Sequence, residues 1–107
     1  MKEMNQMELL ERLEQKGEPL VVFFYTPLCG TCKAARRMLE VAEHLLPENL
    51  LIAAGNVNML PELVMQYRIS SVPALLVTSA DRRSAPAIYY SMGSVERVLD
   101  YIRSVIS

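Results

Sequence analysis

The feature that most constrains this 107-residue chain is an apolar run followed directly by two cysteines. Val21–Tyr25 consists of β-branched and aromatic residues, which predicts a buried strand. Cys29 and Cys32 come next, at the start of a segment whose apolar residues recur at helical spacing. We therefore expect both cysteines at the N-terminus of a helix that follows a central strand.

This placement favours redox chemistry. The thiolate is the form of cysteine that attacks a disulfide, and a helix N-terminus stabilises it with unpaired N–H groups and the positive end of the helix dipole. Three positions separate the two cysteines, so Cys32 lies one helical turn after Cys29, close enough for a disulfide closed over Gly30 and Thr31. We expect Cys29 to be the nucleophile and Cys32 to be the resolving residue.

Composition argues against several other kinds of protein. Eleven basic and twelve acidic residues give a net charge of −1, which is unlike a nucleic-acid-binding surface. No stretch is apolar enough to span a membrane, and the first residues do not resemble a secretion signal, so we expect a cytoplasmic protein. Two cysteines this close together are a poor framework for structural disulfides.

Two simpler interpretations of the cysteines stay open. They could be buried structural residues, or they could bind a metal. A zinc site needs four ligands, and the chain offers two cysteines and one histidine, so such a site would have to be shared between subunits. We expect no metal and no cofactor.

The rest of the chain alternates between helices and strands. Continuous apolar runs at 20–25 and 50–54 predict buried strands that are parallel through a right-handed crossover. A third strand is predicted at 74–78, directly after Pro73, and 87–91 is expected to return as a hairpin strand. Helices are predicted after a cap at Asn5 with Glu8 as its capping-box partner, over about 29–46, after a cap at Asn58, and after a cap at Ser94. This order predicts one α/β domain over 1–107 with a mixed sheet.

The same periodicity assigns individual side chains. Met7 is expected on the buried face of the first helix, and Ala34 and Leu45 on that of the second. Arg82–Arg83 is expected at the solvated tip of the hairpin.

The motifs together resemble the thioredoxin family over nearly the whole chain. The resemblance rests on the strand, the C-G-x-C pair that opens a helix, Val72–Pro73 before a strand hairpin, and Gly93 before the last helix. It implies a thioredoxin-like α/β fold, in which a central mixed sheet has helices on both faces. It also implies that Pro73 is cis and faces the cysteines, and that Val72 offers main-chain groups to an extended substrate segment.

The resemblance further implies a shallow apolar groove around Cys29. Its expected substrate-binding residues are Gly30, Thr31, Val72, Pro73, Met92 and Gly93.

The departures from the family pattern are specific. Phe23 and Ala54 stand where family members commonly carry a buried carboxylate and its lysine partner. The absence of both charged groups is compatible with a stable core, because losing one alone would leave an unpaired buried charge costing about 3–5 kcal/mol. The resemblance implies that this carboxylate takes the proton from the resolving thiol, so its loss bears on the reaction rate. Leu28 replaces the usual tryptophan beside the nucleophile, and Thr31 the usual proline between the cysteines.

These observations predict a cytoplasmic thiol-disulfide oxidoreductase that reduces protein disulfides and contributes to cell redox homeostasis. We expect a monomer whose partners are protein disulfide substrates and an upstream thiol reductant that restores the dithiol. The alternative is a redox-gated binding module that holds a partner in the same groove with slow or no turnover. Phe23 and Ala54 are the residues that favour this alternative.

Overall fold

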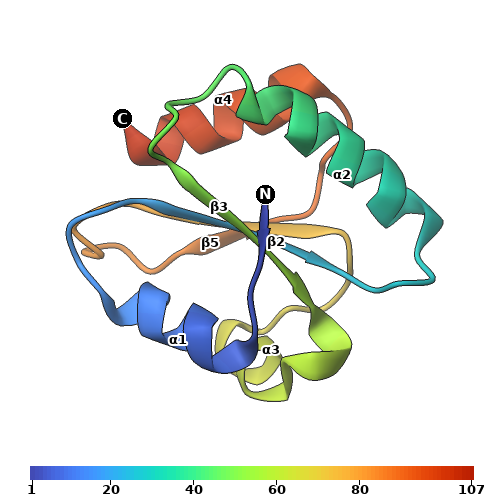
Figure 1. Ribbon diagram of the computed structural model, residues 1–107, viewed down its shortest axis with the longest axis horizontal. Coiled ribbons are helices and arrows are strands. Elements are labelled where there is room, and N and C mark those ends of the chain that lie inside the picture. Colours follow the sequence, from blue (N-terminus) through green and yellow to red (C-terminus); the bar gives the residue numbers. More distant parts are fainter.

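The computed structural model describes residues 1–107 as a five-stranded sheet between two pairs of helices (Figure 1). The strand order is β1-β3-β2-β4-β5. β3 runs parallel to β1 and β2, and β4 is antiparallel to β2 and β5. In chain order the elements are β1 (Lys2–Glu3), α1 (Gln6–Glu14), β2 (Leu20–Tyr25), α2 (Gly30–Glu43), β3 (Leu51–Asn56), the 3-10 turn η1 (Val57–Met59), α3 (Pro61–Tyr67), β4 (Ala74–Thr78), β5 (Ala87–Tyr89) and α4 (Val95–Ile106).

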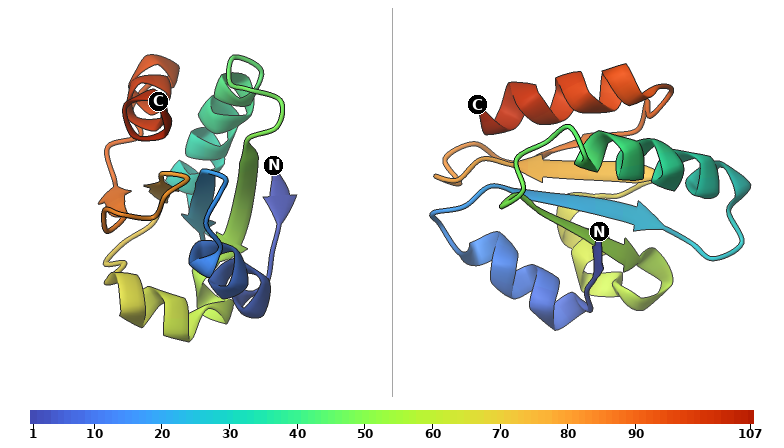
Figure 2. Two further views of the ribbon diagram at one scale, coloured as in Figure 1. Left: turned by 90° about the vertical axis from the view of Figure 1, so that its left-hand side faces the viewer. Right: turned by 45° about the horizontal axis from the view of Figure 1, so that its top comes forward.

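The central strand, β2, is covered on both faces. Side chains of a strand alternate between its two faces, so Val21 and Phe23 pack in one core with α2 and α4, whereas Val22 and Phe24 pack in another with α1 and α3. Figure 2 shows the two helix layers on opposite sides of the sheet. The predicted fold class, a mixed sheet with helices on both faces, is confirmed.

Several predicted elements are confirmed residue by residue. The strands expected at 20–25 and 74–78 have those bounds. Asn5 and Glu8 form the predicted capping box, and the Ser94 hydroxyl accepts a hydrogen bond from the N–H of Arg97 at the start of α4. None of the helices is long and apolar enough to cross a membrane.

The edges of the sheet differ from the prediction. β1 was not expected, because two exposed residues carry no hydrophobic alternation; they join the sheet by pairing with Ala53 and Ala54 of β3. β3 continues two residues past the expected end, to Asn56, while β5 stops at Tyr89 instead of 91.

The predicted cap at Asn58 is wrong. The Asn56 side chain caps the 3-10 turn by accepting from the Asn58 N–H. The N-terminus of α3 is capped from another helix, because Oε1 of Gln6 accepts hydrogen bonds from the N–H groups of Glu62, at 2.8 Å, and Leu63, at 3.3 Å.

Three side chains expected in the core are exposed. Met7 is 78% exposed because α1 turns Leu9 and Leu13 toward the sheet instead. Leu45 is 56% exposed because α2 ends at Glu43, not at 46, so the helical spacing no longer applies to it. Ala34 is exposed on the side of α2 that faces a groove described below.

The prediction for Arg82 is also wrong, because this side chain is not solvated at the tip of the hairpin. Its guanidinium donates to four main-chain carbonyls from three separate segments: those of Arg12 and Leu13 at the end of α1, of Glu18 before β2, and of Ser79 after β4. The side chain therefore joins the end of α1 to the loop between β4 and β5.

We expect Arg82→Ala to lower the free energy of unfolding by about 1–3 kcal/mol, because the four carbonyls lose a charged donor. Arg82 has a positive φ of 56°, and alanine meets the same backbone cost there as arginine, so the loss reports on the side chain. Arg83→Ala is the matched control, since Arg83 is exposed and pairs only with Asp81 at 3.8 Å. Equal denaturant midpoints for the two variants would contradict this role.

Candidate active site

The site is built where β2 ends and α2 begins. Cys29 is the N-cap residue of α2, and its sulfur accepts a hydrogen bond from the Cys32 N–H at 3.1 Å. A disulfide joins the two cysteines, whose Cα atoms are 5.2 Å apart. An N-cap side chain satisfies an N–H group that the helix itself leaves unpaired. The sulfur of Cys29 thus lies at the positive end of the α2 dipole.

The two cysteines differ in exposure. Cys32 is 3% exposed and belongs to the core between the sheet and the α2–α4 layer, whereas Cys29 is only partly buried against that core. Thr31 is exposed, and its hydroxyl oxygen lies 3.3 Å from the Cys29 sulfur. The first turn of α2 carries no acidic residue that would oppose a thiolate.

A groove of about 490 Å³ runs beside the cysteines, between α2 and the segment before α4. It brings together four residues that the sequence assigned to substrate binding, namely Thr31, Pro73, Met92 and Gly93. Met92 is mostly buried, at 8% exposure, so it contributes to the floor of the groove. The groove also includes residues that sequence reasoning missed, from α2 and from β5 to α4: Ala34, Ala35, Met38, Tyr90, Ser91 and Arg97.

Val72 lies on the other side of Pro73, in a second groove of about 290 Å³. The Val72–Pro73 peptide bond is cis. The N–H and C=O of Val72 have no main-chain hydrogen-bond partner. Gly30 is the exposed first residue of α2 and lines neither groove.

A family model described as Thioredoxin matches residues 1–103 of the chain. The chain belongs to the thioredoxin family. It is 38% identical over 77 residues to the thioredoxin-like protein YusE of Bacillus subtilis (strain 168), a match that covers 72% of this chain and 69% of that protein. It is 28% identical over 74 residues to the thioredoxin of Acidithiobacillus ferridurans, covering 69% of this chain and 68% of the relative.

Solved structures agree on the fold. Chloroplastic thioredoxin z superposes with a TM-score of 0.83 at 16% identity, covering 97% of this chain and 92% of that one. Membership of the thioredoxin family, together with the Cys29–Cys32 pair, identifies the protein as a thiol-disulfide oxidoreductase and favours an enzyme over a redox-gated binding module.

The departures from the thioredoxin pattern lie close to this pair. Phe23 and Ala54 are partners in the β2–β3 register and are fully buried, at 0% and 1% exposure. Two apolar side chains thus fill adjoining positions where the family commonly has an ion pair. Leu28, in place of tryptophan, is 98% exposed directly before Cys29.

A third cavity, of about 160 Å³, contains a residue that the sequence analysis did not single out. Arg36 lines it together with Cys32 and Tyr25. The signal was available in the sequence, because Arg36 follows Cys32 by four positions and therefore lies on the same side of α2.

Phe23→Asp is expected to destabilise the fold by about 3–5 kcal/mol, because it removes a fully buried ring and buries a carboxylate. Adding Ala54→Lys should recover part of the loss, since the two positions are register partners. Denaturant midpoints of both variants and of Phe23→Leu, which keeps the site apolar, measure these effects. Coincident midpoints for Phe23→Asp and the parent protein would show that Phe23 is not a core residue.

Proposed function

We propose that this protein reduces disulfide bonds of other proteins, with Cys29 as the nucleophile and Cys32 as the resolving cysteine. The observation that carries the proposal is the Cys29–Cys32 disulfide at the start of α2, with the more exposed sulfur at the helix N-terminus. Exposure and thiolate stabilisation coincide at Cys29, as nucleophilic attack requires. Both are weaker at Cys32.

The reaction starts from the dithiol form. The Cys29 thiolate attacks one sulfur of the target disulfide, and the other target sulfur leaves as a thiolate and takes a proton from solvent. Cys32 then loses its proton and attacks the Cys29 sulfur, which releases the second target sulfur. The target has gained two electrons, and the protein is left with the Cys29–Cys32 disulfide present in the structure.

The groove beside the cysteines supports an extended substrate segment. Because the N–H and C=O of Val72 have no main-chain partner, both can pair with a substrate backbone, as a further strand would. Thr31, Pro73, Met92 and Gly93 then line the space for substrate side chains on the α4 side. Gly30 is exposed at the first position of α2 and adds no side chain next to Cys29.

The proposal also includes the cellular setting that the sequence suggests. An upstream thiol reductant returns the disulfide to the dithiol, and the protein acts as a monomer in the cytoplasm, where such reductants are maintained.

Turnover of a protein disulfide tests this function. With dithiothreitol as the electron source, we expect the parent protein to reduce insulin over many cycles and Cys29→Ser to be inactive. Cys32→Ser should stop after the first step and accumulate a mixed disulfide on Cys29, visible as a mass increase that a reductant reverses. An inactive parent protein, or a mixed disulfide that forms on Cys32 in Cys29→Ser but not on Cys29, would contradict the assignment.

Thr31 is expected to set part of the redox potential. Its hydroxyl, 3.3 Å from the Cys29 sulfur, can donate to the thiolate, and whatever stabilises the thiolate makes the disulfide a better oxidant. We predict a less reducing protein than family members with proline at this position, and a more reducing one than members with histidine. A hydrogen bond of about 1 kcal/mol corresponds to roughly 20 mV.

Equilibration with a glutathione buffer measures this effect. Thr31→Val and Thr31→Pro should both shift the potential to more negative values, whereas Thr31→Ser, which keeps the hydroxyl, should stay near the parent value. A redox potential that is unchanged or more positive in Thr31→Pro would show that Thr31 does not control the potential of the Cys29–Cys32 pair.

A further inference from the structure

The resolving step needs a thiolate on Cys32, and the apolar pair beneath it supplies no group to form one. Phe23 and Ala54 occupy adjoining buried positions of β2 and β3, where a carboxylate could have taken the proton. Cys32 is itself 3% exposed, and burial disfavours its charged form. A positive charge near the sulfur would favour the thiolate.

The cavity next to Cys32 provides a cationic side chain. It encloses about 160 Å³ and is lined by Tyr25, Thr26, Pro27, Cys32, Lys33 and Arg36. Arg36 lies one helical turn after Cys32 on α2, and neighbours at this spacing face the same side of a helix. The positively charged Arg36 and the Cys32 sulfur thus come from the same helix and line the same cavity.

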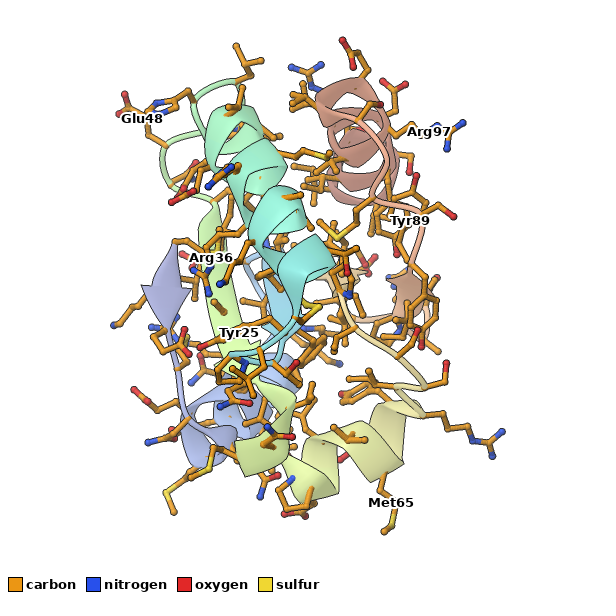
Figure 3. The ribbon with its side chains drawn as sticks, turned by 90° about the vertical axis from the view of Figure 1, so that its right-hand side faces the viewer. Tyr25, Arg36, Glu48, Met65, Tyr89 and Arg97 are labelled. Atoms are coloured by element: carbon orange, nitrogen blue, oxygen red, sulfur yellow. A yellow bond between two sulfur atoms is a disulfide. The ribbon has the colours of Figure 1, made fainter.

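Arg36 is held in place by two aromatic rings. Its guanidinium carbon lies 4.7 Å from the ring centroid of Tyr25 and 5.4 Å from that of Phe23. The two rings stack on each other, with their centroids 5.9 Å apart and an angle of 12° between their planes. Nη1 also lies 3.7 Å from the Met1 sulfur. Figure 3 shows Arg36 above Tyr25, toward the edge of the sheet that β1 forms. Phe23, the residue that replaces the carboxylate, is part of the surface on which the cation rests.

No carboxylate forms an ion pair with Arg36. From β1, Glu3 accepts a hydrogen bond from the Tyr25 hydroxyl. Burial, and next the contact with Glu3, raise the pKa of Tyr25, while the nearby Arg36 lowers it by less, so the phenol is neutral at pH 7. Lys33 of α2 is exposed at the cavity rim, and Glu43, further along α2, pairs with the Met1 amine at 2.9 Å.

We propose that Arg36 is a positioning residue that stabilises the thiolate of Cys32 in the mixed disulfide, a task for which the buried carboxylate is absent. In this step, which rests on the proposed function, the Cys32 proton passes to solvent, the new bond forms between the Cys32 and Cys29 sulfurs, and the electron pair leaves on the substrate sulfur. Arg36 and Cys32 line the same cavity, and a nearby cation favours the charged form of a thiol, against the effect of burial.

The test isolates Cys32 in a Cys29→Ser background and measures its alkylation by iodoacetamide as a function of pH. Arg36→Met keeps the side-chain stem that covers the rings and removes the charge. We expect the midpoint to rise by about one pH unit and the rate at pH 7 to fall about tenfold. Arg36→Lys should restore most of the rate, because it keeps the charge. Arg36→Gln replaces Arg36→Met if the latter folds poorly.

Arg37→Met is the matched control, since Arg37 is the exposed neighbour on α2, carries the same charge and does not line the cavity. A midpoint that does not move in Arg36→Met, or that moves as far in Arg37→Met, overturns the proposal. So does a midpoint that rises equally in Arg36→Lys, since the charge would then not be responsible. These readouts need no substrate turnover, so they stand apart from the insulin assay, whose failure would concern the proposed function alone.

Discussion

The helix and the chemistry depend on one hydrogen bond, from the Cys32 N–H to the sulfur of Cys29. The side chain that caps a first helical turn is commonly an oxygen acceptor; here it is the sulfur of the proposed nucleophile. An N–H group that stabilises a neutral sulfur stabilises a thiolate more, because hydrogen bonds to charged acceptors are stronger. The start of α2 is therefore better satisfied in the reduced protein, and the same contact favours the reactive form.

This cap stays in register because β2 is buried on both faces. The strand cannot slip by one residue without moving Phe23 and Phe24 into each other's cores, so the position at which α2 begins is fixed by packing. An all-apolar strand leaves no buried charge beneath the cysteines. The nearby positive charge lies instead on the rim of the sheet, where Arg36 covers Tyr25 and Phe23 and reaches solvent.

Sequence reasoning succeeded where the determining contacts are local. Strands 20–25 and 74–78 are largely apolar runs that each follow a proline, and the caps at Asn5 and Ser94 are set within four residues. It failed where the structure depends on a contact between residues that are far apart in the sequence. Gln6 caps a helix 56 residues away, and Arg82 binds carbonyls up to 70 residues away, so neither has a periodic signature. For the site, the cysteines were evident and the spacing of Arg36 from Cys32 could be read in the sequence, whereas the cavity they share and the rings under Arg36 required the structure.

The contacts of Arg82 also affect how the protein opens. One guanidinium holds carbonyls at the end of α1, before β2 and after β4, so the last turn of α1 cannot fray independently of the loop between β4 and β5. Segments that share such a link open together, and opening together costs more than fraying alone. Proteases cleave chains through such local openings. An exposed loop that would otherwise be an easy cleavage site is thus protected by a helix near the other end of the chain.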